Sequence, residues 1–257
     1  MIPPKDVPQL PTMADWITPY WQPHPRVRAC VTTRFGTLSP PPWQGFNLGL
    51  NCGDEAERVE QARRHVQRLL GTPHPPTWLR QVHGTRIVTA GDQEAEADGV
   101  WTDQSGFPCA VLTADCLPVL LARTDGSAVA AVHAGWRGLQ QGIIEEAVAR
   151  IAPGGEPVSA WLGPAISQPC YQVGQDVYEA FTGGDPEAAA GFRADAQPHH
   201  WRLSLVQLAW QRLNRMGVTA VLGGEHCTAS DPTRFYSFRY EGQTGRFASL
   251  IWLDPAT

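Results

Sequence analysis

The fold is decided by residues 113–138, which read TADCLPVLLARTDGSAVAAVHAGWRG. Two apolar runs in this stretch, residues 119–122 and 128–133, are typical of buried strands, and the polar residues between them include Asp125-Gly126. An Asp-Gly pair readily adopts the backbone conformation of a two-residue hairpin turn. The stretch therefore predicts an antiparallel hairpin in the interior of the molecule.

The register of this hairpin follows from its turn. If the loop has two residues, Thr124 faces Ser127, and counting along both strands places His133 opposite Pro118. Cys116 is then the diagonal neighbour of His133 on the same side of the sheet. We therefore expect a thiol and an imidazole to converge at the open end of the hairpin.

This pair of side chains suggests a metal site. Zinc prefers thiolate and imidazole ligands, but Cys116 and His133 alone would leave its coordination incomplete. His83 is the third candidate, because it lies at the start of a predicted strand and the adjacent Gly84 allows close approach. Three protein ligands and one open position would indicate a catalytic zinc site. The alternative is that these residues are ordinary core residues of apolar strands.

Two arginines are candidates for binding an anion. Arg137 lies in the turn Ala134-Gly135-Trp136-Arg137-Gly138, where a strand leads into a helix and backbone N–H groups could hold a phosphate beside the guanidinium. Arg34 ends the run Val31-Thr32-Thr33 and could bind a phosphate or a carboxylate. A glycine turn needed only for packing and an exposed charge at a strand end are the simpler explanations, and the sequence does not separate them.

Length and charge exclude several classes of protein. The chain has 257 residues and a net charge of −5, so it can build a sizeable core but lacks the basic excess that nucleic acid binding needs. Its longest apolar stretch, residues 109–122, is interrupted by Asp115 and Pro118 and is shorter than the roughly 20 residues of a membrane span. We expect neither a nucleic acid partner nor a membrane.

The cysteines and the start of the chain indicate the compartment. Six scattered cysteines in a chain of this length are typical of reduced thiols, and the first residues lack the basic and apolar pattern of a secretory signal. We therefore expect a cytoplasmic protein with a flexible segment over residues 1–12 and a single catalytic domain over residues 13–257.

Along the chain, the predicted helices and strands show neither a strict strand-helix alternation nor a repeat. This order favours an α+β fold, with mixed sheets covered by helices, over a doubly wound parallel sheet. The predicted helices begin with one capped by Asp54 and ended by Gly71, and the others cover residues 139–151, 175–181 and 204–216. The predicted strands cover residues 29–33, 86–90, 109–113, 119–122, 128–133, 158–162, 218–222 and 247–253.

The chain resembles the YfiH family, whose members are variously called polyphenol oxidoreductase (laccase), purine nucleoside phosphorylase or peptidoglycan editing factor. Separate blocks along nearly the whole chain carry the resemblance: Val31-Thr32-Thr33-Arg34, Phe46-Asn47-Leu48-Gly49, Gln81-Val82-His83, Ala97-Asp98-Gly99, Thr113-Ala114-Asp115-Cys116-Leu117-Pro118, Val132-His133-Ala134-Gly135-Trp136-Arg137-Gly138, Leu162-Gly163-Pro164-Ala165-Ile166 and Thr244-Gly245-Arg246. One departure is Leu38-Ser39-Pro40-Pro41-Pro42, which replaces an expected glycine-rich loop.

The resemblance implies a fold and a site. It implies a four-layer α/β/β/α sandwich related to the catalytic domain of a cytotoxic necrotising factor. It also implies that His83, Cys116 and His133 are zinc ligands. Asn47, in the second of the quoted blocks, is expected to bind substrate or phosphate together with Arg34 and Arg137.

The resemblance further implies phosphorolysis of adenosine, inosine and methylthioadenosine, with deamination of adenosine as a second activity, so a nucleoside and phosphate are the expected partners.

Copper-dependent phenol oxidation is less favoured, because eight scattered histidines do not supply the several copper sites of an electron relay. Amide hydrolysis in a cell-wall precursor, with Cys116 as nucleophile and His133 as base, remains an alternative based on fold analogy. A non-enzymatic metal-binding role is disfavoured by the open position. The physiological substrate, the phosphate-binding arginine and the oligomeric state are left open.

Overall fold

The structure is a computed structural model that describes residues 8–255. The segment expected to be flexible, residues 1–12, falls largely on residues 1–7, which lie outside the described residues. Within its described part, the Gln9 N–H donates to Thr37 Oγ1 at 2.8 Å, and the carbonyl oxygen of Pro11 lies 2.7 Å from Nε2 of His65. The boundary at residue 12 stays a prediction.

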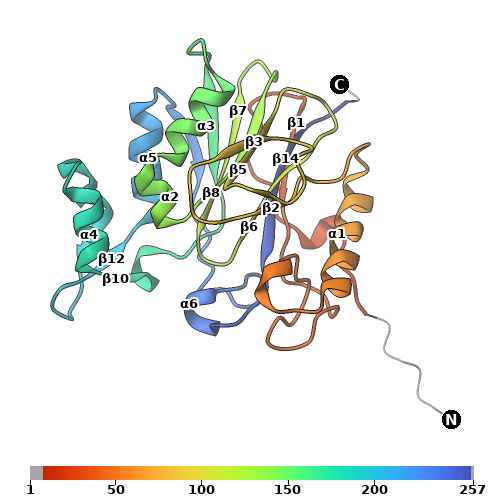
Figure 1. The fold of residues 1–257 in the computed structure, drawn as a ribbon, viewed down its shortest axis with the longest axis horizontal. Helices are drawn as coiled ribbons and strands as arrows, with labels where there is room; N and C mark the ends of the chain where they lie inside the picture. The colour runs from red at the N-terminus through yellow and green to blue at the C-terminus, as the bar shows by residue number, and fades with distance from the viewer. Residues whose placement is uncertain (1–7, 256–257) are drawn as a thin grey trace.

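Two sheets form the centre of the molecule (Figure 1). The larger has the strand order β13-β9-β7-β8-β5-β3 and contains both parallel and antiparallel pairs. Its strands are β3 (Ile87–Thr89), β5 (Gly99–Thr102), β7 (Leu117–Arg123), β8 (Val129–Ala134), β9 (Val158–Leu162) and β13 (Ala220–Gly223). The smaller is antiparallel and has the order β1-β14-β6, with β1 (Val27–Val31), β6 (Cys109–Thr113) and β14 (Phe247–Leu253).

Helices cover the outer faces of both sheets (Figure 1). On the large sheet lie α2 (Trp136–Gln141), α3 (Ile143–Ile151) and α5 (Leu205–Arg215), and on the small sheet lies α1 (Ala56–Leu70). Two minor sheets flank the two main sheets. One pairs β2 (Leu79–Arg80) with β4 (Ala95–Glu96), and the other has the order β10 (Gln172–Gly174), β12 (His200–Leu203), β11 (Phe192–Ala194). The remaining α-helices are α4 (Gln175–Thr182) and α6 (Phe238–Glu241). Short 3-10 helices, η1 (Met13–Asp15), η2 (Leu50–Cys52), η3 (Gln168–Cys170) and η4 (Pro186–Gly191), complete the list.

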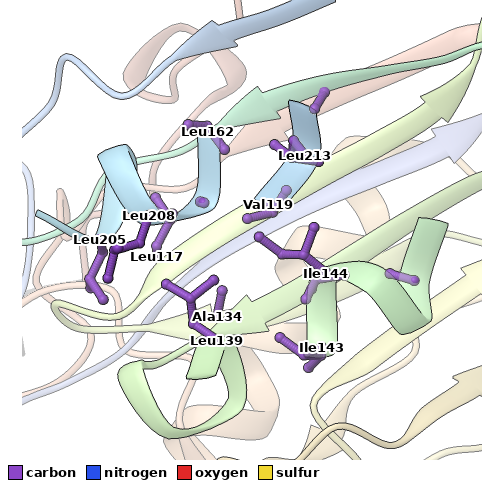
Figure 2. Packing of buried hydrophobic residues seen from close by; sticks show 14 of the residues in the cluster. Leu117, Val119, Ala134, Leu139, Ile143, Ile144, Leu162, Leu205, Leu208 and Leu213 are labelled. Carbon is purple, nitrogen blue, oxygen red and sulfur yellow. The ribbon is translucent and has the colours of Figure 1, made fainter. Parts of the chain in front are cut away.

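The side chains of β7 point alternately to its two faces, and this explains how the layers are joined. Leu117, Val119 and Leu121 pack with the helices on one face, as Figure 2 shows for Leu117 beside Leu208. Leu120, from the other face, packs between the two sheets. A strand buried on both faces must be apolar at every position, as β7 nearly is. The molecule therefore has four layers: the helices α2, α3 and α5, the six-stranded sheet, the three-stranded sheet, and α1. This arrangement confirms the predicted α+β four-layer sandwich.

The predicted hairpin is confirmed in detail. Strands β7 and β8 pair in antiparallel fashion, and Pro118 lies opposite His133 as the turn required. All eight predicted strands are present, with ends shifted by at most two residues. The short strands β2, β4, β5, β10, β11 and β12 were not predicted.

The sequence-based prediction of the helices was wrong in two details. The N-cap of α1 is Glu55 rather than Asp54, whose carboxylate accepts the Glu55 N–H at 2.8 Å. The helix predicted over residues 139–151 is broken, because Gly142 adopts a φ of 98° between α2 and α3. A left-handed residue ends an α-helix, and glycine adopts that conformation without steric cost.

Among residues 8–255, the helices are too short or too polar to cross a bilayer.

Candidate metal centre and cavity

Three side chains from three separate segments meet at the open end of the β7–β8 hairpin. Cys116 immediately precedes β7, His133 belongs to β8, and His83 lies in the loop after β2. The candidate ligand atoms of these residues all lie within 4.8 Å of one another, and Cys116 Sγ is 3.9 Å from His83 Nε2. The group could therefore hold a metal ion.

A buried carboxylate, Asp98, organises two of these three residues. Its Oδ1 lies 2.8 Å from Nδ1 of His133 and accepts the backbone N–H of His83 at 2.9 Å, while its Oδ2 accepts the N–H groups of Val82 and Gly84 at 3.1 and 2.7 Å. Because a carboxylate only accepts, Nδ1 of His133 must carry the proton. This leaves Nε2 of His133 as the nitrogen available to a metal.

A second carboxylate fixes the backbone at Cys116. Asp115 is nearly buried and has a φ of 95°, a conformation that non-glycine residues rarely adopt. Its Oδ1 accepts the hydroxyls of Thr228 and Ser237 at 2.6 and 2.8 Å, and its Oδ2 accepts the Arg239 N–H at 2.6 Å. These bonds stabilise the turn that directs the neighbouring Cys116 side chain into the site.

The glycines of the turn after β8 allow the segments to approach. A Cβ atom on Gly135 would lie 2.8 Å from Cδ2 of His83 and 3.1 Å from Sγ of Cys116. A Cβ atom on Gly138 would lie 2.7 Å from the carbonyl oxygen of Gly84. The glycine-rich turn therefore allows close packing against the site, while phosphate binding at the start of the six-residue helix α2 stays a prediction.

The electrostatics of the group favour a thiolate beside an imidazolium when no metal is bound. Burial raises the pKa of Cys116, but the His133 and His83 imidazoles outweigh burial and lower this pKa to about 6. Burial lowers the pKa of His133, but the Cys116 thiolate and the Asp98 carboxylate outweigh it and raise this pKa to about 9. The pKa of Asp98, despite burial, is held below its usual value by His133 and the backbone N–H groups.

A cavity of about 310 Å³ adjoins the group. Cys116, His83 and His133 lie in its wall, and the cations in the same wall are Arg63 and Arg246. Its other lining residues come from the 49–52 segment, from β2 and Gln81, from residues 112–114 and from Phe238. Its size and its mixture of apolar and polar groups are typical of a small-molecule site.

Arg34 is not among the residues that line this cavity. Its Nη1 pairs with Glu241 Oε1 at 2.7 Å and donates to the carbonyl oxygens of Pro232 and Phe235 at 3.1 and 3.3 Å. Its guanidinium also lies 4.6 Å from the centre of the Tyr236 ring. Arg34 thus forms an ion pair that links the segment after β1 to the segment around α6.

Arg137 and Asn47 are also not among the residues that line this cavity. Arg137 is exposed, and its guanidinium lies 4.4 Å from the centre of the Trp136 ring. Asn47 is fully buried, and its Oδ1 accepts the N–H groups of Gly49 and Arg246 at 2.9 and 2.8 Å. Asn47 therefore shapes the cavity wall from behind.

Two residues of the site were missed by the reasoning from sequence. Asp98 had a signal, because an acid between the apolar Ala97 and the run Gly99-Val100-Trp101 needs a partner if it is buried, and His83 and His133 were already candidates. Arg246 had a weaker signal, a cation directly before the apolar strand β14. Neither signal identifies its partner residues.

Known proteins resemble the chain over nearly its whole length. The family model described as multi-copper polyphenol oxidoreductase laccase matches residues 28–254. A Pseudomonas aeruginosa protein named purine nucleoside phosphorylase is 44% identical over 243 residues, which is 94% of this chain and 100% of the relative. Purine nucleoside phosphorylase YfiH of Escherichia coli is 42% identical over 244 residues, again 94% of this chain and 100% of the relative.

Solved structures of similar proteins also match the chain over nearly its whole length. A Neisseria meningitidis protein superposes with a TM-score of 0.88 at 43% identity, covering 93% of this chain and 99% of that one. YlmD from Geobacillus stearothermophilus superposes with a TM-score of 0.86 at 28% identity, covering 96% and 98%. With the match of the family model and the likeness of its curated relatives, these structures show that the chain belongs to the YfiH family of laccase-like proteins.

Proposed function

We propose that the protein is a zinc-dependent purine nucleoside phosphorylase that also deaminates adenosine. Relatives that carry the name purine nucleoside phosphorylase and match nearly the whole chain support a phosphorylase-like enzyme. The observation that carries the proposal is that His83, Cys116 and His133 share one cavity wall with the cation Arg246. A nucleoside and an anion could both be bound there.

The donor set fits zinc. One thiol and two imidazoles are ligands that zinc accepts, and three protein ligands leave a position open. Asp98 fixes the tautomer of His133 and holds the His83 loop, as carboxylates beside zinc-binding histidines commonly do. Bound by these residues, zinc would supply a Lewis acid at the cavity wall.

Phosphorolysis requires that the chain place two substrates and exclude water. An oxygen of hydrogen phosphate forms a bond to the ribose C1′, and the bond from C1′ to N9 of the purine breaks. The purine leaves with the electron pair and takes up the proton that hydrogen phosphate gives up, so ribose 1-phosphate and the free base are formed. In this proposal a cation of the cavity wall neutralises the phosphate, and Phe238, 57% exposed in the cavity wall, offers a flat apolar face to the base.

Deamination exchanges the C6 amino group of adenosine for the oxygen of water and releases ammonia. The chain contributes the position of the purine, because Asp98 accepts the proton of His133 Nδ1 and holds this proposed metal ligand in the cavity wall. The proposal therefore places the C6 edge of the purine toward His133 and the ribose of the nucleoside toward the cation in the same cavity wall.

The name of the family model raises copper-dependent phenol oxidation as an alternative. A laccase-like relay needs several copper sites with many histidines. Among the described residues, His83, Cys116 and His133 form the single group of three or more candidate ligands. One such group does not support multi-copper chemistry, and we propose zinc as the metal.

Product analysis tests the proposal. Adenosine incubated with the purified protein and phosphate should give adenine and ribose 1-phosphate, and without phosphate it should give inosine only. Failure to form either product, together with release of an amino acid from a cell-wall precursor peptide, would instead assign the site to amide hydrolysis.

A further inference from the structure

The two arginines in the cavity wall differ in what compensates their charge. Arg63 is nearly buried, its Nη1 pairs with Glu94 Oε1 at 2.7 Å, and its Nε donates to the carbonyl oxygen of Leu48 at 3.1 Å. Its guanidinium also lies 4.7 Å from the centre of the Trp78 ring. The charge of Arg63 is therefore neutralised within the protein.

Arg246 is half-buried and lacks such a partner. Its Nη1 donates to the carbonyl oxygens of Thr244 and Gly245 at 2.9 and 2.8 Å, and its guanidinium lies 5.6 Å from the centre of the Phe238 ring. Within residues 8–255, no carboxylate pairs with Arg246 and no acceptor bonds to its Nε or Nη2. A positive charge with unused N–H donors therefore remains at the cavity.

The backbone of Arg246 is held firmly. Its N–H donates to Asn47 Oδ1 at 2.8 Å, and its carbonyl oxygen accepts the Leu48 N–H at 3.0 Å. Gly49 packs flat against its side chain, since a Cβ atom there would lie 2.7 Å from Cγ of Arg246. The cation is thus fixed in position before any ligand arrives, which favours binding.

We propose that Arg246 is the phosphate-binding residue of the site, with Asn47 and Gly49 as positioning residues. This inference rests on the proposed function. A guanidinium with free N–H groups on adjacent nitrogens matches a pair of phosphate oxygens, and a partly buried site strengthens that contact. We assign this role to Arg246 in place of Arg34 and Arg137, because Arg34 is paired with Glu241 and the exposed Arg137 does not line the cavity.

Steady-state kinetics test the assignment. Arg246→Ala should raise the KM for phosphate roughly 10- to 100-fold, the loss expected for one charge-assisted contact, while the KM for adenosine and the bound zinc change little. Arg246→Lys should recover part of this loss, because it keeps the charge and loses the second donor nitrogen. Arg150→Ala, an exposed arginine at the end of α3, is the matched control and should behave as the wild type.

Gly49→Ala separates position from charge. Gly49 has a φ of −90°, so alanine fits its backbone, but the new Cβ would displace the Arg246 side chain. The KM for phosphate should rise, although every charge is retained. An unchanged KM for phosphate in both Gly49→Ala and Arg246→Ala would overturn the assignment, and a selective rise in Arg137→Ala or Arg34→Ala would move the phosphate to those residues.

A binding measurement distinguishes failure of this assignment from failure of the proposed function. Calorimetry with inorganic phosphate should show binding to the wild type, binding at least about 10-fold weaker to Arg246→Ala, and none with acetate as the probe. If adenosine is not cleaved but this difference is found, the anion site stands and the phosphorylase does not. If adenosine is cleaved and Arg246→Ala binds phosphate like the wild type, the phosphorylase stands and this site is wrong.

Discussion

The Oδ1 atom of Asp98 lies 2.8 Å from Nδ1 of His133, in the interior of the protein. The same carboxylate accepts the backbone N–H groups of three consecutive residues, Val82, His83 and Gly84. One side chain thus sets both the tautomer of one proposed ligand and the loop of another. Asp98 links the central hairpin to a segment that belongs to neither main sheet.

Replacing Asp98 by asparagine should weaken the proposed metal site. The amide would place donor hydrogens against N–H groups that now meet only acceptors, and His133 would lose the carboxylate that raises its pKa. We expect zinc affinity to fall roughly 10- to 100-fold and the free energy of unfolding to fall by about 1–3 kcal/mol. Chelator competition and urea unfolding measure these, and the exposed Asp103→Asn is the control. Equal affinity in both variants would remove Asp98 from the site.

The thiol of Cys116 should be reactive at neutral pH in protein stripped of metal. Its pKa is lowered to about 6, so the reactive thiolate forms as pH rises through 6 and is nearly complete at pH 7.5. Burial raises the pKa of Cys30 to about 12, so Cys30 should stay unmodified. Iodoacetamide labelling followed by peptide mass spectrometry gives both rates. A half-maximal rate for Cys116 near pH 9 would contradict the lowered pKa, and protection of Cys116 by added zinc is expected.

A single methyl group at Gly135 should disturb the site and leave the fold intact. The φ of −64° at Gly135 suits alanine, but its Cβ would come within 2.8 Å of the His83 ring and 3.1 Å of Cys116 Sγ. We expect Gly135→Ala to lower zinc affinity at least about 10-fold, with a circular dichroism spectrum like that of the wild type. Gly184→Ala, where a Cβ would meet nothing within 4 Å, is the matched control. Retention of full zinc affinity in Gly135→Ala would show that the crowding is relieved without moving the ligands.

The central hairpin could be predicted because its information is local. An Asp-Gly turn and alternating side chains fix which residues face each other, so Pro118 and His133 were paired correctly. The break at Gly142 was missed because apolar residues continue at helical spacing on both sides of it. The unpredicted strand β12 has mixed burial, and short strands of that kind lack a clear period.

The surroundings of the site depend on distant contacts that the sequence does not reveal. Arg34 was proposed to bind an anion, and its ion pair with Glu241, 207 residues away in the chain, could not be predicted from local sequence. Asn47 was assigned to substrate but bonds to Arg246, 199 residues away. Local patterns identify residue types able to bind an anion, whereas the tertiary structure decides which cation is left unpaired.

The central claim is that His83, Cys116 and His133 hold the metal on which phosphorolysis depends. The most direct test is to strip the metal with a chelator, titrate zinc back, and follow bound zinc and release of adenine from adenosine in the same samples. For the wild type, activity should return in proportion to zinc and level off near one ion per chain, and Cys116→Ser should recover neither tight zinc binding nor activity. Full phosphorolysis by the stripped wild-type protein, or by Cys116→Ser, would contradict the account.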